Sequence, residues 1–244
     1  EILHHYLSTN SSLPSDYLST VQFDTDRDLW IGTMDNQLLQ LEHPTRHWKS
    51  YNVIKARCIA QKDAHTIAVG TVVLINKQTG KQAHIFKSTD NKGEDFNAFI
   101  QSIAFIDDEQ AWLGSDGGGL YLCNLQTLEK RAFSTEQRLP SNRVSALLID
   151  HSKMLWITTD HGLACLPPQP SMQIYNQNFE HVMSRFYNRS AAILLADGRV
   201  ALGSTTGVLI FKPHISLTSY QAPSLQLTNF RIDNIDSRES TDMR

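Results

Sequence analysis

The sequence lacks the features that define several protein classes. Its 244 residues contain only three cysteines, Cys58, Cys123 and Cys165, an odd number with no close pair. Such a set excludes a disulfide framework and a cysteine-based zinc site. Each cysteine lies in an apolar run, so we expect all three to be buried thiols.

Long apolar runs and an excess of one charge are also missing. No apolar run approaches the roughly 20 residues that span a bilayer as a helix. Lysine and arginine number 22 against 25 aspartate and glutamate, which gives a net charge of −3 and no basic footprint for nucleic acid or anionic lipid. Hydrophobic residues make up 41% of the chain, which is enough for a sizeable core.

A five-residue kernel recurs along the chain at nearly constant spacing. Three copies carry tryptophan at their second position and two carry alanine. The copies are Leu29–Thr33, Ala111–Ser115 and Leu155–Thr159 with tryptophan, and Ile67–Thr71 and Val200–Ser204 without it. They begin at residues 29, 67, 111, 155 and 200, so the intervals are 38, 44, 44 and 45 residues. This regularity indicates a repeat architecture.

Short apolar runs separated by turn residues surround each kernel. One run precedes it, one follows a second turn, and a more polar segment closes the unit. Runs rich in β-branched and aromatic residues indicate strands, and four strands in 38–45 residues are typical of a β-propeller blade. Trp30, Trp112 and Trp156 then occupy equivalent positions, where we expect their rings to fill the wedges between neighbouring blades.

We therefore predict an all-β fold, a β-propeller fragment of five four-stranded blades. The blades are expected at residues 13–50, 51–94, 95–138, 139–182 and 183–222, after the outer strand of a preceding blade at 1–12. A helical turn is expected around residues 178–185. Since residues 1–12 match the fourth strand of a blade whose other strands are missing, we expect the chain to be a piece of a longer protein.

The repeats resemble the two-component regulator propeller repeat. The resemblance lies in Leu139-Pro140-Ser141-Asn142 leading to the kernel at Leu155, and in Leu13-Pro14-Ser15-Asp16 leading to the kernel at Leu29. Residues 223–244 resemble the start of the immunoglobulin-like three-tyrosine domain that follows such propellers. The second blade departs from the pattern, because it lacks the tryptophan, the Leu-Pro start and the acidic turn; the fifth carries Ala201.

The resemblance implies the periplasmic sensor region of a membrane-anchored, dimeric signalling protein. Such proteins are most often hybrid two-component histidine kinases that detect oligosaccharides and control transcription. By this resemblance the kinase belongs to other domains, so we do not expect the chain itself to be an enzyme or to bind nucleic acid. The alternatives are a scaffold for protein–protein interaction, a sensor with a diguanylate cyclase output, and a propeller glycoside hydrolase or lyase.

Three further motifs have simple structural interpretations. Asp24–Asp28 has the spacing of a calcium loop, but Leu29 stands where such a loop needs glycine, so we interpret it as an acidic hairpin turn. Asp116–Gly119 is interpreted as a turn with positive φ rather than a phosphate loop. His43 and His47 flank Pro44 and have no evident third ligand. We expect no metal and no cofactor.

Propeller geometry places the candidate ligand-binding residues on one face. The loops that enter the inner strands and the turns between second and third strands open together around the central channel. Their side chains combine aromatic rings with planar polar groups, which suits a glycan. The candidates are Tyr17, Asp35, Lys55, Phe99, Asp116, Asn142, Arg143, Asp160, His161 and Asn188.

Overall fold

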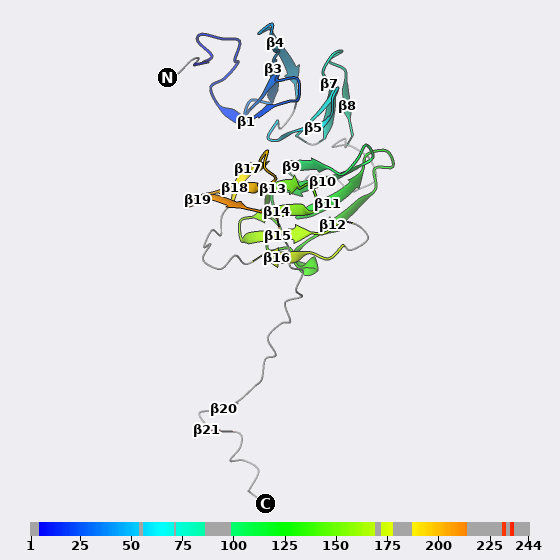
Figure 1. The fold of residues 1–244 in the computed structure, drawn as a ribbon, viewed down its shortest axis with the longest axis vertical. Coiled ribbons are helices and arrows are strands. Elements are labelled where there is room, and N and C mark those ends of the chain that lie inside the picture. The colour runs from blue at the N-terminus through cyan, green and yellow to red at the C-terminus, as the bar shows by residue number, and fades with distance from the viewer. Residues whose placement is uncertain are drawn as a thin grey trace, which may run out of the picture. The chain divides into compact units, whose positions relative to one another are not determined.

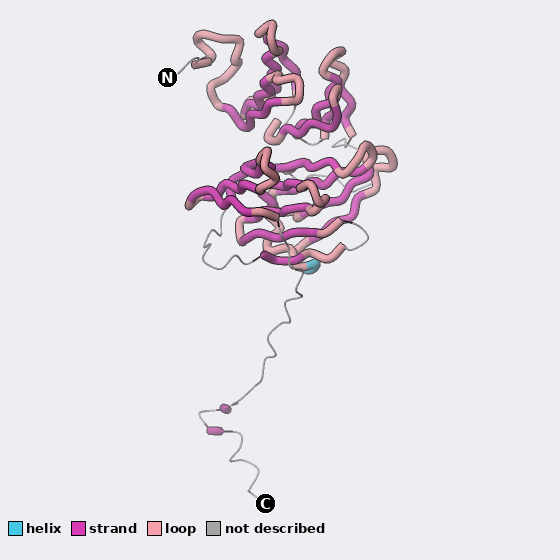
Figure 2. Tube along the Cα trace, in the orientation of Figure 1, coloured by secondary structure: helices cyan, strands magenta, loops and turns pink. Residues whose placement is uncertain are grey.

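The computed structural model describes residues 5–53, 56–70, 72–85, 99–168, 172–177, 187–213, 231–232 and 235–236. The chain divides into one unit of residues 1–213 and a second unit of residues 214–244. In the first unit, antiparallel strands form five sheets (Figure 1), and Figure 2 shows how completely strands and turns dominate. In the part of the chain that the structure describes, no helix is long and apolar enough to cross a membrane.

Each sheet is built from strands that follow one another in sequence. The first contains β1 (Leu18–Phe23), β2 (Leu29–Thr33), β3 (Gln37–Leu41) and β4 (Trp48–Asn52). The second contains β5 (Ile59–Asp63), β6 (Thr66–Val69), β7 (Val73–Asn76) and β8 (Gln82–His84). The third contains β9 (Ile100–Phe105), β10 (Gln110–Ser115), β11 (Leu120–Asn124) and β12 (Lys130–Phe133), followed by the 3₁₀ helix η1 (Thr135–Gln137).

The last two sheets of the first unit continue the series. The fourth contains β13 (Val144–Ile149), β14 (Leu155–Thr159), β15 (Gly162–Leu166) and β16 (Tyr175–Gln177). The fifth contains β17 (Tyr187–Leu194), β18 (Val200–Ser204) and β19 (Gly207–Phe211), three strands within the described residues. In the second unit, β20 (Arg231–Ile232) and β21 (Ile235–Asp236) pair antiparallel.

This arrangement is a five-bladed β-propeller, which confirms the fold predicted from the repeat. The kernels supply the second strand of each blade, between the inner strand and the third strand, and in the second blade this strand ends at Val69. The inner strands are β1, β5, β9, β13 and β17. Residues 178–185, the predicted helical turn, lie outside the described residues.

The N-terminal segment differs from the predicted outer strand of a preceding blade. Residues 5–12 contain no strand, and side chains of this segment bond to the local backbone around a turn at residues 8–10. Asn10 Oδ1 accepts from Leu7 N at 2.7 Å, and Ser11 Oγ donates to Leu7 O at 2.6 Å. The segment nevertheless covers the first blade, since Tyr6 packs edge-on against Trp48. The first blade also runs past residue 50, because β4 ends at Asn52.

The kernel tryptophans lie in the wedges between blades, as the repeat predicts. Trp30 is buried among residues of the first and second blades, and Trp112 among residues of the third and fourth. Trp156 meets Phe211 of the fifth blade with 4.8 Å between ring centroids. The acidic turns orient two of these rings: Asp24 Oδ2 accepts from Trp30 Nε1 and Asp150 Oδ2 from Trp156 Nε1, each at 2.9 Å.

Two kernel glycines, Gly32 and Gly114, lie against the blade that follows. A Cβ at Gly114 would stand 2.5 Å from Val144 Cγ1 in the inner strand of the fourth blade. A Cβ at Gly32 would stand 2.2 Å from the carbonyl oxygen of Ala56, which leads into the second blade. At both positions any side chain would force the two blades apart.

A buried ion pair joins the first two blades. Lys77 Nζ lies 2.9 Å from Asp24 Oδ2 and 2.6 Å from Asp26 Oδ2, and the Asp24 side chain is fully buried. Burial alone would raise the pKa of Asp24, but the hydrogen bonds from Lys77 and Trp30 outweigh it and hold that pKa below its ordinary value. Burial alone would lower the pKa of Lys77, but its bonds to both carboxylates raise it.

The replacement Gly114→Ala should lower the free energy of unfolding by about 1–3 kcal/mol, because the added methyl group overpacks the wedge. Val144→Ala removes the atom that it meets, so the loss from Gly114→Ala should be smaller in that background. Urea unfolding of the two single variants and the double variant measures this coupling. Strict additivity would contradict the contact.

Lys77→Met should lower the free energy of unfolding at neutral pH by about 3–5 kcal/mol, because it leaves the Asp24 carboxylate buried without its cation. Since the pKa of Asp24 is lowered in the fold, its contribution is present above the unfolded-state pKa and disappears as the pH falls through the folded-state value. The difference between wild type and Lys77→Met should therefore shrink towards pH 3.

Melting temperatures recorded from pH 3 to pH 7 measure this effect. Asp26→Asn is the matched control, because it removes the exposed carboxylate of the same cluster and should have a much smaller effect. A difference between wild type and Lys77→Met that stays constant with pH would show that the ion pair does not carry the stability.

Candidate functional site

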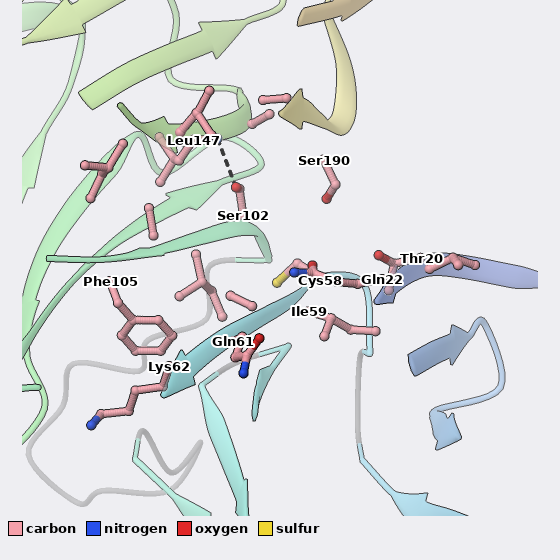
Figure 3. A pocket seen from close by; sticks show the side chains of 18 residues that line it. Thr20, Gln22, Cys58, Ile59, Gln61, Lys62, Ser102, Phe105, Leu147 and Ser190 are labelled. Atoms are coloured by element: carbon pink, nitrogen blue, oxygen red, sulfur yellow. Dashed lines mark hydrogen bonds between the residues drawn. The ribbon is translucent and has the colours of Figure 1, made fainter. Parts of the chain in front are cut away.

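A central channel runs between the inner strands of the five blades. Its cavity has a volume of about 420 Å³ and is lined by residues of each inner strand (Figure 3). Small and polar side chains dominate its wall: Thr20, Gln22, Cys58, Ser102, Ala146, Ser190 and Ala192. A hydrogen bond joins the neighbouring inner strands β9 and β13, since Ser102 Oγ accepts from Leu147 N at 2.9 Å (Figure 3). The volume falls within the range of small-molecule pockets.

A β-bulge recurs at one end of the inner strands. In β1, Leu18 pairs with Thr33 and Thr20 with Gly32, so Ser19 is the extra residue. The same shift makes Gln101 the extra residue of β9 and Ser145 that of β13. Bulges re-aim side chains. Here the bulge turns Gln101 towards Asp116, with Gln101 Nε2 lying 3.2 Å from Asp116 Oδ2.

Asp116 is the centre of a charged cluster at the mouth of the channel, in the turn between β10 and β11. Its Oδ1 lies 3.1 Å from Nε of Arg143, and its Oδ2 lies 3.3 Å from Nη2 of Arg189. We call Gln101, Asp116, Arg143 and Arg189 the Asp116 cluster. The carboxylate is largely buried, whereas Arg143 and Arg189 are 65% and 60% exposed. The cluster therefore connects the third, fourth and fifth blades and presents two guanidinium groups to solvent.

Backbone hydrogen bonds hold this cluster in place. Gly117 N and Gly119 N both donate to the carbonyl oxygen of Asn142, at 3.0 and 2.8 Å. Gly117 and Gly119 have φ of 102° and 85°, which confirms the predicted positive-φ turn. Asn142 also accepts from Thr135 N through Oδ1 at 2.9 Å, so its side chain supports the start of η1.

A second polar pair lies in the turn between β14 and β15. His161 Nδ1 lies 3.0 Å from Asp160 Oδ1, and the imidazole is exposed. Burial would raise the pKa of Asp160, but hydrogen bonds from His161 and Ser141 and the charge of Arg143 hold it below its ordinary value. The carboxylate of Asp160 is thus ionised at neutral pH and available as a hydrogen-bond acceptor.

The remaining predicted site residues are more scattered. Tyr17 is 76% exposed and Asp35 is exposed, both on the first blade, and within the described residues neither is bonded to the Asp116 cluster. Phe99 is partly exposed, with the guanidinium of Arg57 5.3 Å from its ring centroid. Asn188 is exposed in β17, and Lys55 lies outside the described residues.

The sequence did not predict two members of the Asp116 cluster, Gln101 and Arg189. Gln101 is a polar residue within the apolar run 100–106 and stands where β1 and β13 carry serine. This replacement of serine by a longer amide is the sequence feature that could have identified it. Arg189 carries no such signal, because its place depends on the irregular start of β17.

Cys58, Cys123 and Cys165 are free and buried, as predicted, and burial raises the pKa of Cys58 and of Cys123 to about 12. Among the described residues, no three side chains of His, Cys, Asp or Glu gather as metal ligands would.

No protein-family model matches the chain. A histidine kinase P4 from Formosa agariphila is 30% identical over 118 residues, which cover 48% of this chain and 8% of that protein. Two similar solved structures are extracellular domains described as those of hybrid two-component systems from B. thetaiotaomicron. One has a TM-score of 0.63 and 17% identity, covering 93% of this chain and 39% of that domain. The other has a TM-score of 0.61 and 17% identity, covering 82% and 27%.

The chain shares the propeller fold of these two-component sensor domains. It spans less than two fifths of the length of each of the three proteins. The match to the kinase is a match to a small part of that protein, and the likeness to the solved structures is one of fold.

Asp116→Asn should lower the free energy of unfolding by about 1–3 kcal/mol, because three donors share this partly buried carboxylate. The control is Asp108→Asn, in which the carboxylate is 88% exposed and bonded only to lysine, and should change the free energy by no more than about 0.5 kcal/mol. Urea midpoints report both. Equal effects would show that the Asp116 cluster is as loosely held as a surface pair.

Proposed function

We propose that this chain is part of the ligand-sensing, extracytoplasmic region of a membrane-anchored sensor histidine kinase, and that it binds an oligosaccharide at the channel mouth. The fold shared with extracellular domains of hybrid two-component systems and the local similarity to a histidine kinase support the sensor role. The observation that carries the binding site is the Asp116 cluster, which presents two exposed guanidinium groups from adjacent blades.

The chemistry of the rim suits a sugar. Each arginine uses one nitrogen for Asp116, so its other N–H groups can donate to ligand hydroxyls. The ionised carboxylate of Asp160 accepts hydrogen bonds from hydroxyls. Phe99, which is 41% exposed and carries the Arg57 guanidinium 5.3 Å from its ring centroid, adds aromatic surface to the rim for the CH groups of a sugar. Planar polar groups beside an aromatic ring are the combination that a carbohydrate needs.

The position of the cluster also offers a way to transmit binding. Asp116, Arg143 and Arg189 come from three successive blades, so a ligand held by both arginines favours one arrangement of these blades over others. A ligand shifts such an equilibrium by its difference in affinity for the two arrangements. In a dimeric parent protein this shift would pass to the membrane and to the kinase.

The electrostatics favour binding over catalysis. A glycosidase needs one carboxyl group with a raised pKa as its acid. At this rim, Asp160 has a lowered pKa and Asp116 is bonded to two cations. We therefore propose that this chain binds its ligand without converting it.

Thermal-shift measurements with a panel of neutral and acidic oligosaccharides test the proposal. A bound sugar at about 100 times its dissociation constant should stabilise the protein by about 2.7 kcal/mol. Arg143→Gln should abolish the shift, whereas Arg199→Gln, an exposed arginine on the turn between β17 and β18, should leave it unchanged. A protein that responds to no oligosaccharide, or responds equally after Arg143→Gln, would exclude this site.

A further inference from the structure

The wedge at Trp112 differs from those at the other two kernel tryptophans. Asp24 and Asp150 stand six residues before their tryptophans and accept from the indole N–H. In the third blade Asp107 stands five residues before Trp112, and its Oδ1 accepts from Glu109 N and Gln110 N. Within the described residues no hydrogen bond reaches Nε1 of Trp112, although the side chain is only 3% exposed. The turns are equally long, since Phe105 pairs with Ala111 as Phe23 pairs with Leu29, so Ile106 stands where the other two blades carry aspartate. The indole N–H of Trp112 therefore has no carboxylate partner.

A second sequence difference concerns the side chain that follows the third strand of the next blade and fills the wedge beside Trp30. Ile67 pairs with Ile75 in the second blade, and two residues later Lys77 reaches back to Asp24 beside Trp30. In the fourth blade Leu155 pairs with Leu166, so the equivalent of Lys77 is Pro168. The proline ring is too short to reach the preceding blade as lysine does.

These two differences coincide with a hollow of about 320 Å³ beside Trp112, between the third and fourth blades. Its wall is formed mainly by Ile106, Trp112, Ile149, Leu155, Leu166 and Met172. Lys153 is the charged residue that lines it; it is exposed, and among the described residues it has no acidic partner. We call this hollow the Trp112 pocket.

We propose that the Trp112 pocket binds a small amphipathic carboxylate, such as a medium-chain fatty acid. The apolar wall takes the hydrocarbon, because binding there removes its methylene groups from water. The carboxylate lies towards the ammonium group of Lys153, and the indole N–H of Trp112 supplies the second donor. An apolar wall with one cation at its edge and an indole N–H that has no protein acceptor matches a ligand with a single anionic head.

This pocket is separate from the proposed oligosaccharide site. Lys153 lies in the turn between β13 and β14, whereas Asp160 and His161 lie in the turn at the other end of β14. The inference therefore does not depend on the proposed function.

The test uses octanoate as the probe and the four tryptophan indole N–H signals in a nitrogen–proton NMR spectrum as the readout. Octanoate should shift the indole signal of Trp112, which Trp112→Phe identifies by its loss. Lys153→Gln should weaken octanoate binding about threefold to fivefold, as expected for one exposed charge. Lys81→Gln, which removes an exposed lysine from the second blade, is the matched control and should leave binding unchanged.

Two further measurements complete the test. Ile106→Phe should fill the hollow and abolish octanoate binding while the other indole signals keep their positions. Octanol, which lacks the carboxylate, should bind wild type and Lys153→Gln equally. The proposal is overturned if octanoate leaves the Trp112 signal unmoved, if Ile106→Phe binds octanoate as wild type does, or if self-association of the chain, seen by sedimentation, occupies the pocket instead.

Discussion

The contact between the second strand of one blade and the blade that follows it governs this structure. A twisted sheet with apolar residues on both faces cannot bury them alone, so each blade needs a neighbour. The kernel provides this contact through a tryptophan and a glycine. Trp30 and Trp112 fill the wide part of their wedges, and Gly32 and Gly114 allow the next blade to approach closely. The spacing of the kernels along the chain follows from this one contact.

The same contact determines where chemistry can occur. Packing fixes the sheets, so the turns at one end of the strands come together around the channel and hold side chains from several blades. The Asp116 cluster exists because Asp116 lies one residue beyond the kernel of the third blade, facing the start of the fourth. Its partly buried carboxylate anchors the cluster, and the exposed N–H groups of its arginines can meet a ligand. The rigid kernel strand and the turn that faces a ligand are therefore adjacent in sequence.

The sequence predicts the repeated features well and the unrepeated ones poorly. Strand order, the wedge tryptophans and the positive-φ turn at Gly117 follow from residue types that recur with the period. Lys77 carries no repeat signal, because its partner Asp24 lies in the preceding blade, 53 residues away. Arg189 depends on a shift in β17, where Tyr187 pairs with Ser204 but the next pair is Ala192 with Leu202. Asn142 stays a candidate ligand residue, and the sequence did not predict that its Oδ1 also supports the start of η1.

The central claim is that a ligand binds at the end of the strands where the Asp116 cluster lies. Amide hydrogen exchange with and without a stabilising oligosaccharide tests it most directly. We expect added protection in residues 116–119, 141–143 and 160–162, which form the rim, and none in the turns at 107–110 and 150–154 at the opposite ends of the strands. Protection confined to those opposite turns, or to the outer strands, would contradict the account.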